Sequence, residues 1–200
     1  MTEPTAHLPV MASEVLEVIA PNDLETIVDG TYGAGGYAKA YLNSSQCTVY
    51  GIDRDADAIG RGRPLERGYG GRLHLVEGCF ADMEALLGAR GIKSVSGIGL
   101  DLGISSTQLD DPDRGLSFQV DGYLDMRMSR CTSDDPTAAE VIANTDEVAL
   151  ADLIWRYGDE RKSRSIAKAI VEARRAVPIT RTLQLADLVA RVVGRDKRRK

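Results

Sequence analysis

Four short apolar runs, separated by segments long enough for helices, dominate the first half of this 200-residue chain. They lie at residues 26–29, 48–52, 73–76 and 97–100, and each is bounded by glycine or by charged residues. Partly β-branched runs that alternate with helix-length segments are typical of βαβ units. Right-handed crossovers then place helices on both faces of the sheet. The pattern predicts an α/β fold with a mostly parallel sheet, preceded by a short helix at residues 13–19 with Ser13 as its N-cap.

Composition places the chain among ordinary globular proteins, with 43% hydrophobic and 28% charged residues. The longest stretch without a charged side chain is residues 40–52, too short for a membrane helix, which needs about 20 apolar residues. No basic segment leads into an apolar run at the start, so no secretory signal is visible and a cytoplasmic location is expected. Three cysteines without a C-x-x-C motif, Cys47, Cys79 and Cys131, indicate neither a disulfide framework nor a zinc site.

Charge is segregated along the chain. Residues 1–150 carry a net charge of -13, whereas residues 151–200 carry +8. Such segregation is typical of a body that binds a small molecule together with a basic face that meets nucleic acid. The side chains that would contact RNA phosphates, or else form only a solvated helix face, are Arg161, Arg164, Lys168, Arg174 and Arg175. The tail at 195–200 is expected to be a disordered basic end.

The second half of the chain changes character after about Gln108. Residues 109–130 are rich in Asp, Gly and Met without a clear period, which predicts a long functional loop. Helices follow. One is capped by Thr145 and carries Leu150, Leu153, Ile154 and Tyr157 on one face; a second turns Ile166, Ala169, Ile170 and Ala173 inward and ends before Pro178; a third starts at Thr182.

A glycine-rich segment, Asp29-Gly30-Thr31-Tyr32-Gly33-Ala34-Gly35-Gly36-Tyr37-Ala38, lies where the first strand should turn into a helix. Without Cβ atoms the backbone adopts left-handed conformations and approaches a ligand closely, and Gly33, Gly35 and Ala38 satisfy G-x-G-x-x-A. Alone, the segment is also compatible with a turn needed only for helix–strand packing.

An acid at the end of the second run strengthens the ligand interpretation. Asp53 lies about 20 residues beyond the glycines, where a carboxylate accepts the ribose hydroxyls of an adenosine-containing cofactor. This pair does not separate NAD from S-adenosylmethionine. Phe80, after the third run, is placed to pack on adenine, although a lone aromatic is more often part of a core.

The fourth run leads into a polar loop at residues 99–110, at the topological switch point where doubly wound sheets bind ligands. Amino methyltransferases carry an acidic or amide residue here. The exocyclic amine of a base is a poor nucleophile, and a hydrogen-bond acceptor takes up the positive charge that develops as a methyl group reaches it. Asp101 is the candidate acceptor; alternatively it binds the methionine end of the cofactor.

Together these segments resemble the bacterial small-subunit ribosomal RNA methyltransferase H family, also called MraW. The match extends from residue 7 to about 190, and its most specific part runs from residue 101 to 128. The segments that carry it are His7-Leu8-Pro9-Val10, the glycine-rich segment from Asp29, Asp101-Leu102-Gly103-Ile104-Ser105-Ser106-Thr107-Gln108-Leu109-Asp110, Arg114-Gly115-Leu116-Ser117-Phe118, Asp121-Gly122-Tyr123-Leu124-Asp125-Met126-Arg127-Met128, Tyr157-Gly158-Asp159-Glu160-Arg161 and Pro178-Ile179-Thr180-Arg181-Thr182.

The resemblance implies methylation of the 4-amino group of a cytosine in the decoding region of 16S rRNA, within a small-subunit particle and with S-adenosylmethionine as donor. It also implies that the cofactor site is lined by Gly35, Gly36, Tyr37, Asp53, Phe80, Asp101 and Gln108. The transfer chemistry does not require a metal, and the sequence indicates none. Two positions depart from many members, which have His at 37 and Pro at 107. The departure at Tyr37 affects a side-chain contact but not a main-chain one.

The family fold is a Rossmann-like class I methyltransferase core with an inserted helical domain. It implies residues 1–108 as the first part of the core, 109–195 as the inserted loop and helices, and 196–200 as a basic tail. Since family members continue with a segment resembling H-P-A-T-R-T-F-Q, we expect a C-terminally truncated chain whose fourth strand has an unprotected edge. The target base needs an apolar platform, for which Phe118, Tyr123, Trp155 and Tyr157 are available.

Two other functions remain open at this point. An NAD-dependent oxidoreductase is suggested by G-x-G-x-x-A and Asp53. The second is an RNA-binding or assembly protein that keeps the fold without activity.

Overall fold

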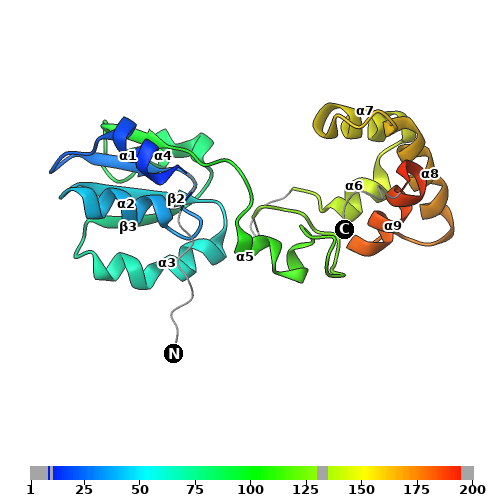
Figure 1. Cartoon of the computed structure of the whole chain (residues 1–200), viewed down its shortest axis with the longest axis horizontal. Coiled ribbons are helices and arrows are strands. Elements are labelled where there is room, and N and C mark those ends of the chain that lie inside the picture. The colour runs from blue at the N-terminus through cyan, green and yellow to red at the C-terminus, as the bar shows by residue number, and fades with distance from the viewer. Residues whose placement is uncertain (1–8, 10, 130–134, 195–200) are drawn as a thin grey trace. The chain divides into compact units, whose positions relative to one another are not determined.

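A computed structural model describes residue 9 and residues 11–129 and 135–194, and its elements are labelled in Figure 1. The chain forms two compact units: a first unit of residues 1–105 with 128–131, and a second unit of residues 106–127 with 132–200. The first unit is built on a sheet of β1 (Thr26–Asp29), β2 (Thr48–Asp53), β3 (Leu73–Glu77) and β4 (Gly97–Gly99).

The four strands are parallel and ordered β3-β2-β1-β4. All four predicted runs are confirmed as strands, with ends within one residue of those expected. Strand β1 pairs with β2 on one side and with β4 on the other, so the strand order reverses between β1 and β4. The carboxyl ends of β1 and β4 therefore form the topological switch point at which ligands bind in open α/β sheets.

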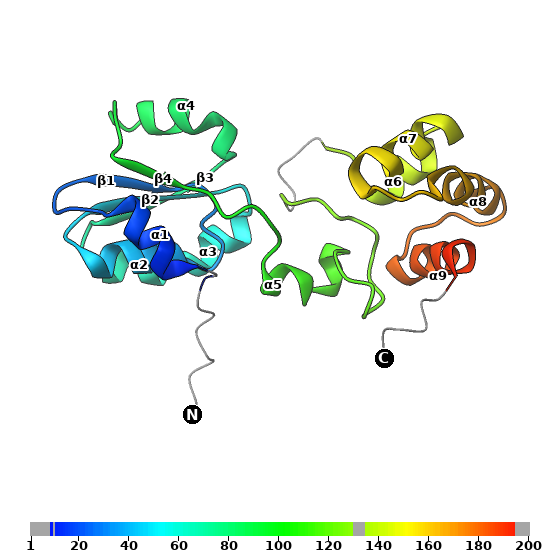
Figure 2. The same ribbon diagram turned by 45° about the horizontal axis from the view of Figure 1, so that its top comes forward.

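Helices cover both faces of this sheet (Figure 2). The helices α1 (Ala12–Ile19), α2 (Gly36–Ser44) and α3 (Ala56–Gly68) lie on one face, and α4 (Met83–Gly88), which follows the short 3-10 helix η1 (Phe80–Asp82), lies on the other. Side chains alternate accordingly along β1: Ile27 belongs to the core cluster under α2, and Val28 belongs to the cluster with α4. The predicted doubly covered sheet is confirmed.

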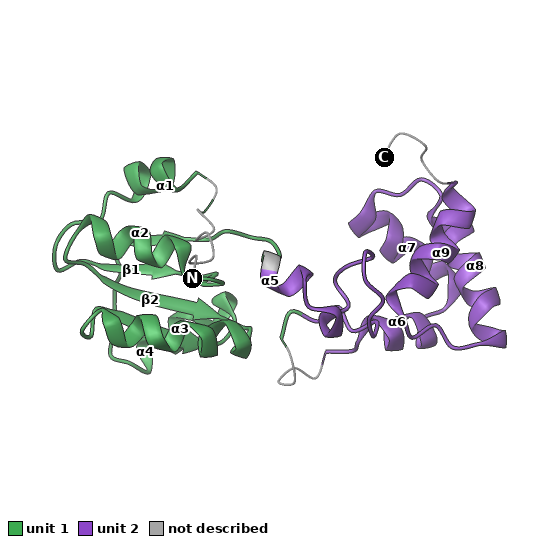
Figure 3. Ribbon diagram, turned by 60° about the horizontal axis from the view of Figure 1, so that its bottom comes forward, with its two compact units in different colours: residues 1–105, 128–131 green, residues 106–127, 132–200 purple. Residues whose placement is uncertain are grey.

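The second unit is mainly helical (Figure 3). Its core is built around α8, whose Ile166, Ala167 and Ile170 are buried against the apolar faces of the neighbouring helices. The helices are α5 (Ser106–Leu109), the 3-10 helix η2 (Pro112–Arg114), α6 (Ala138–Asn144), α7 (Glu147–Gly158), α8 (Ser163–Ala176) and α9 (Thr182–Val193).

Residues 110–129 form the long irregular segment that was predicted, interrupted only by η2. It is fixed to the start of α9. Gly122 N–H donates to the Thr182 hydroxyl and Thr182 N–H donates to the Gly122 carbonyl, both at 3.0 Å. The guanidinium of Arg181 pairs with the Asp121 carboxylate at 2.9 Å. An irregular segment in a compact unit needs such partners for its backbone groups.

Three local expectations are wrong. Ser13 is not the N-cap of α1, which begins one residue earlier with Met11 in the cap position. Thr145 is the C-cap of α6; Asp146 caps α7 by accepting from Val148 and Ala149 N–H. The pattern places Leu153 and Tyr157 with the inward face, yet these residues are 41% and 80% exposed.

Helix α6 itself was not predicted. It starts in a capping box, in which Thr137 and Glu140 satisfy each other's N–H groups.

His74 lies in β3, and its ring stacks on Tyr50 of the neighbouring strand, with centroids 4.8 Å apart. His7, Cys131 and the tail at 195–200 lie outside the described residues. Among the described helices none has both the length and the apolar character needed to cross a bilayer.

Candidate functional site

The glycine-rich segment forms the loop between β1 and α2. Gly33 and Gly35 have φ values of 54° and 76°, in the left-handed region that side chains with a Cβ rarely adopt. The loop is anchored at Tyr32, whose N–H donates to the Ile52 carbonyl at 2.9 Å and whose carbonyl accepts from Gly35 N–H at 2.7 Å. Its backbone conformation therefore depends on glycine at two positions.

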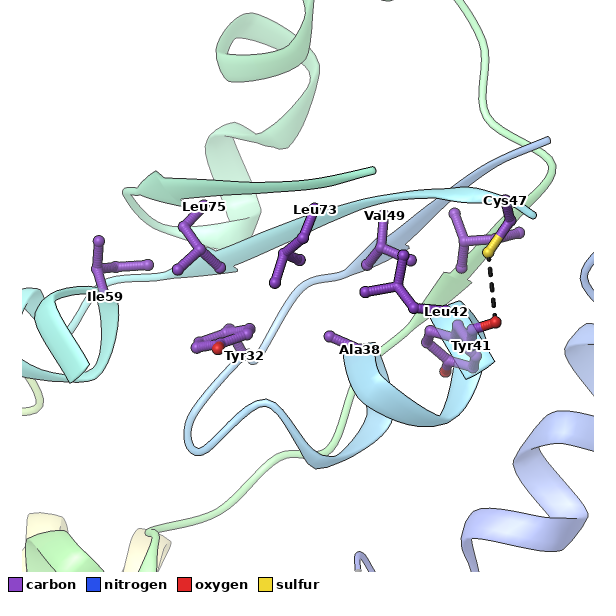
Figure 4. Close-up of a cluster of buried hydrophobic side chains, with 10 residues drawn as sticks. Tyr32, Ala38, Tyr41, Leu42, Cys47, Val49, Ile59, Leu73 and Leu75 are labelled. Carbon is purple, nitrogen blue, oxygen red and sulfur yellow. Dashed lines mark hydrogen bonds between the residues drawn. The ribbon is translucent and has the colours of Figure 1, made fainter. Parts of the chain in front are cut away.

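The Tyr32 ring lies in the core beneath the sheet, beside Ala38 and Leu75 (Figure 4), and is only 3% exposed. A Cβ built on Gly35, Gly51 or Gly62 would approach atoms of this tyrosine to 2.6 Å. These three glycines come from the loop, from β2 and from α3, and all three make room for one ring. The sequence left two roles open for the glycine segment, ligand approach and helix–strand packing. The contact between Gly35 and Tyr32 was missed, because nothing local in the sequence indicates it.

Asp29, the last residue of β1, closes the loop from inside. One carboxylate oxygen accepts from Thr31 N–H at 3.3 Å and the other from Ala38 N–H at 3.1 Å. Burial raises the pKa of Asp29 to about 7, although these two bonds lower it, and the negative charges of Asp53 and Asp101 raise it further. Asp29 lies in the glycine-rich segment, but the sequence analysis predicted no role for it. The feature that could have indicated one is an acidic residue at the end of a buried strand.

Asp53 ends β2 and holds the loop from the other side. Its Oδ2 accepts from Gly33 N–H at 2.7 Å and its Oδ1 from Asp55 N–H at 2.9 Å. Burial raises the pKa of Asp53, while the two N–H bonds act in the opposite direction. Each carboxylate oxygen offers more than one acceptor site, so Asp53 is able to hold the loop and still accept ribose hydroxyls.

Asp101 follows β4 and lies beside Tyr37 of α2. Both residues line an open cavity of about 450 Å³ between α1, α2 and β4. The rings of Tyr37 and Tyr41 are 6.5 Å apart, and burial together with the charges of Asp101, Asp29 and Glu14 raises the pKa of Tyr37. The Tyr41 hydroxyl, which has no hydrogen-bond partner in the described part of the chain, lies against Gly99.

The remaining expected site residues are placed as follows. Gly36 begins α2 and packs against Pro9; a Cβ there would be 3.0 Å from Pro9 Cγ. Phe80 begins η1, is 38% exposed and lies beside Gly30 of the loop. Gln108 is buried within α5 of the second unit. The structure thus brings Gly35, Gly36, Tyr37, Asp53, Phe80 and Asp101 to one edge of the first unit, and Gln108 belongs to the second.

The first unit suits an adenosine-containing cofactor that carries a positive charge. Its glycine loop leaves backbone free of Cβ atoms, and Asp53 stands at the strand end where a ribose is bound. Asp29, Asp53 and Asp101 are close enough for the charges of the last two to raise the pKa of the first. A cation among them relieves that repulsion. No cluster of three metal-ligating side chains occurs among the described residues.

The second unit presents basic side chains on α8 and just before it. Arg161, Arg164, Lys168 and Arg175 are exposed. Arg174 is a correction to the expected set: its guanidinium donates to the carbonyls of Ile142 and Thr145, the latter at 2.7 Å, and therefore joins α8 to the end of α6 instead of facing solvent. All four aromatic candidates for a base platform, Phe118, Tyr123, Trp155 and Tyr157, are exposed.

The parallel sheet, the glycine loop between β1 and α2 and the acid at the end of β2 define the class: a Rossmann-like α/β domain of the nucleotide-cofactor type. The family follows from sequence comparison. The profile of the MraW methylase family matches residues 4–200, and the chain belongs to that family.

Curated relatives named ribosomal RNA small subunit methyltransferase H agree over nearly the whole chain. That of Rhodospirillum centenum is 52% identical over 97% of this chain and 58% of its own length. The relative from Paramagnetospirillum magneticum is 50% identical over 96% of this chain and 60% of its own length. That of Parvibaculum lavamentivorans is 51% identical over 94% and 55%. The chain therefore spans 55–60% of the length of these relatives.

Proposed function

We propose that this protein methylates the 4-amino group of a cytosine in the decoding region of 16S rRNA, with S-adenosylmethionine as the methyl donor. The carrying observation is the glycine loop held by Asp53, with Asp101 at the adjacent switch point, in a member of a methylase family. The name shared by the relatives, ribosomal RNA small subunit methyltransferase H, supports the substrate. The family also favours methyl transfer over hydride transfer to NAD.

The cofactor would lie over the loop. Main-chain groups of Gly35, Gly36 and Tyr37 contact its methionine part, Asp53 accepts the ribose hydroxyls, and Phe80 packs on the adenine. The family resemblance also assigns Gln108 to the cofactor, and we propose the same role here. When bound, S-adenosylmethionine supplies a methyl group on a positively charged sulfur. The Asp101 carboxylate either accepts a hydrogen bond from the cytosine amine or binds the methionine end.

The RNA substrate would be held by the second unit. The exposed basic residues around α8 attract phosphates without reading sequence, and an exposed aromatic ring offers a surface on which a flipped base stacks. We propose a small-subunit ribosomal particle as the form in which the RNA is recognised, and a cytoplasmic location.

Nucleoside mass spectrometry tests the reaction directly. Small-subunit rRNA from cells with the gene should contain 4-methylcytidine, and rRNA from cells without it should not; an unchanged level after deletion contradicts the proposal.

Calorimetry on the chain with each cofactor separates the alternatives. Binding of S-adenosylmethionine but not NAD is expected, and the reverse result favours an oxidoreductase. Cofactor binding without single-turnover methyl transfer to small-subunit particles favours an inactive RNA-binding or assembly protein.

A further inference from the structure

A side-chain hydrogen bond connects the loop that follows β1 to the segment that follows β4. The Thr31 hydroxyl oxygen accepts a hydrogen bond from Asp101 N–H at 2.7 Å, across 70 positions of the sequence. Thr31 is itself fixed, because its N–H donates to the buried Asp29 carboxylate at 3.3 Å. The hydroxyl that accepts from Asp101 therefore belongs to a residue whose own backbone is held by Asp29.

This bond extends the β1–β4 ladder beyond the ends of both strands. The last regular bond runs from Gly30 N–H to the Gly99 carbonyl at 2.9 Å. In a regular parallel ladder the next would run from Asp101 N–H to the Gly30 carbonyl. The Thr31 hydroxyl takes the place of that carbonyl. The position of Asp101, where the chain leaves β4, is therefore set by a side chain and not by the backbone of β1.

Asp101 has little else to hold it. Its side chain is exposed, and the bond to Thr31 is the one hydrogen bond that it makes within the described part of the chain. The next residue, Leu102, is 70% exposed. The place of the Asp101 backbone relative to the glycine loop thus depends on the Thr31 hydroxyl.

We propose that Thr31 is a positioning residue for Asp101: its hydroxyl fixes the carboxylate at the switch point relative to the loop that holds the cofactor. The inference rests on the proposed function, in which the loop binds the cofactor and Asp101 acts on the amine or on the methionine end. In this proposal Thr31 touches neither the cofactor nor the cytosine amine.

Thr31→Val keeps the shape of the side chain and removes the acceptor, whereas Thr31→Ser keeps the acceptor. The Asp101 N–H that loses its partner lies at an exposed site and turns to water, so the fold should survive. Thr26→Val, at the other end of β1, is a matched control, since the Thr26 hydroxyl makes no hydrogen bond among the described residues. Thr31→Ala repeats the test if the valine packs poorly.

Amide hydrogen exchange by NMR reports on the bond itself. In Thr31→Val the Asp101 N–H should exchange at least about tenfold faster, while Gly30 N–H keeps its protection; Thr31→Ser and Thr26→Val should resemble the wild type. Unchanged exchange at Asp101 overturns the proposal. So does a loss of protection at Gly30 in both Thr31→Val and Thr31→Ala, because the residue would then simply hold the strands together.

A double-mutant cycle reports on function. The dissociation constant for S-adenosylmethionine and the single-turnover rate of methyl transfer to small-subunit particles are measured for Asp101→Ala, Thr31→Val and the pair. Whichever quantity Asp101→Ala changes, Thr31→Val should change in the same sense by about three- to tenfold, with rescue by Thr31→Ser and no further effect in the Asp101→Ala background.

Additive effects overturn the proposal, as does a Thr31→Val variant with normal affinity and rate. An Asp101→Ala variant that is normal in both also overturns it, because there is then no role to position. If the wild-type chain fails to bind S-adenosylmethionine, the proposed function fails instead, and the exchange rates still decide whether Thr31 fixes Asp101.

Discussion

The two units both fix an irregular loop, but with opposite results. In the first unit, Asp29 and Asp53 accept the backbone N–H groups of Thr31, Gly33 and Ala38 and so hold the glycine loop. In the second, residues 110–129 are fastened to α9 through Gly122, Thr182 and Arg181. These polar bonds shape the proposed cofactor site in the first unit, whereas in the second they fasten a long segment to a helix. Substitution of the residues that hold the two loops should therefore change ligand affinity in the first unit and mainly stability in the second.

The largest effect is expected in the second unit, for Gly122→Ala. A Cβ at this position would overlap the Pro112 carbonyl, and Gly122 is unable to move because Thr182 bonds both its N–H and its carbonyl. We expect a loss of about 3 kcal/mol in the free energy of unfolding, measured by urea denaturation. Gly158→Ala, at an open position in α7, should change stability by less than about 1 kcal/mol. Equal effects of the two would show that the loop gives way.

The first unit should respond differently at Asp53. Asp53→Ala removes the proposed ribose acceptor and the bond to Gly33 N–H. We expect about thirtyfold weaker binding of S-adenosylmethionine by calorimetry, equivalent to about 2 kcal/mol. Glu77→Ala, an exposed acid at the end of the neighbouring strand β3, is the matched control and should bind normally. An affinity for Asp53→Ala within threefold of wild type would remove Asp53 from the site.

Two glycines in α3 provide a sharper contrast within one helix. A Cβ built on Gly62 would lie 2.6 Å from side-chain atoms of Tyr32 and of Leu75, whereas nothing lies within 4 Å of a Cβ on Gly60. Alanine should stabilise the helix by about 0.5–1 kcal/mol at Gly60 and destabilise the protein by about 2 kcal/mol at Gly62. Denaturant titrations measure both. Stabilisation at both positions would mean that the Tyr32 ring does not need this space.

Two neighbouring arginines on α8 separate a structural basic residue from an exposed one in the second unit. Arg174→Ala removes the bonds to the Ile142 and Thr145 carbonyls and should cost about 1.5 kcal/mol of stability. Arg175→Ala removes the same charge from an exposed position and should stay within about 0.5 kcal/mol. Unfolding midpoints measure both variants. Equal midpoints for Arg174→Ala and Arg175→Ala would contradict a structural role for Arg174.

Regular periodicity predicted most of the fold. The four strands followed from short apolar runs, and α8 and α9 followed from apolar residues at helical spacing. Ends were less accurate where two capping residues adjoin: Thr145 and Asp146 are both suitable, and the choice depends on α6, whose seven residues carry too short a pattern to identify.

The site divides in the same way. Asp53 and Asp101 were identified because each follows an apolar run predicted as a strand, and parallel strands bring their carboxyl ends to one edge. The space that Gly35, Gly51 and Gly62 leave for Tyr32, and the bond from Asp101 to Thr31, join distant positions. No local pattern encodes such pairings, because they depend on how the crossovers pack. Arg174 illustrates the converse, since a basic residue beside others on a helix looked like part of a charged face.

The smallest predicted effect concerns pH and the buried Asp29. Its pKa is about 7 in the folded protein, against an ordinary value of 3.8, because burial disfavours the charged form. Between these two values the folded state binds more protons than the unfolded state, so the contribution of Asp29 to stability is fully present below about pH 4. That contribution is lost as pH rises through 7.

Between pH 6 and 7 this group alone should lower the free energy of unfolding by about 1 kcal/mol. Asp29→Asn does not titrate and should lack that part of the slope, even though it weakens one of the two bonds to Thr31 and Ala38 N–H at every pH. Urea denaturation of both proteins at several pH values gives the difference. If the two slopes agree, Asp29 is already ionised at pH 6, and the N–H groups of the glycine loop offset more of the effect of burial than a pKa of about 7 implies.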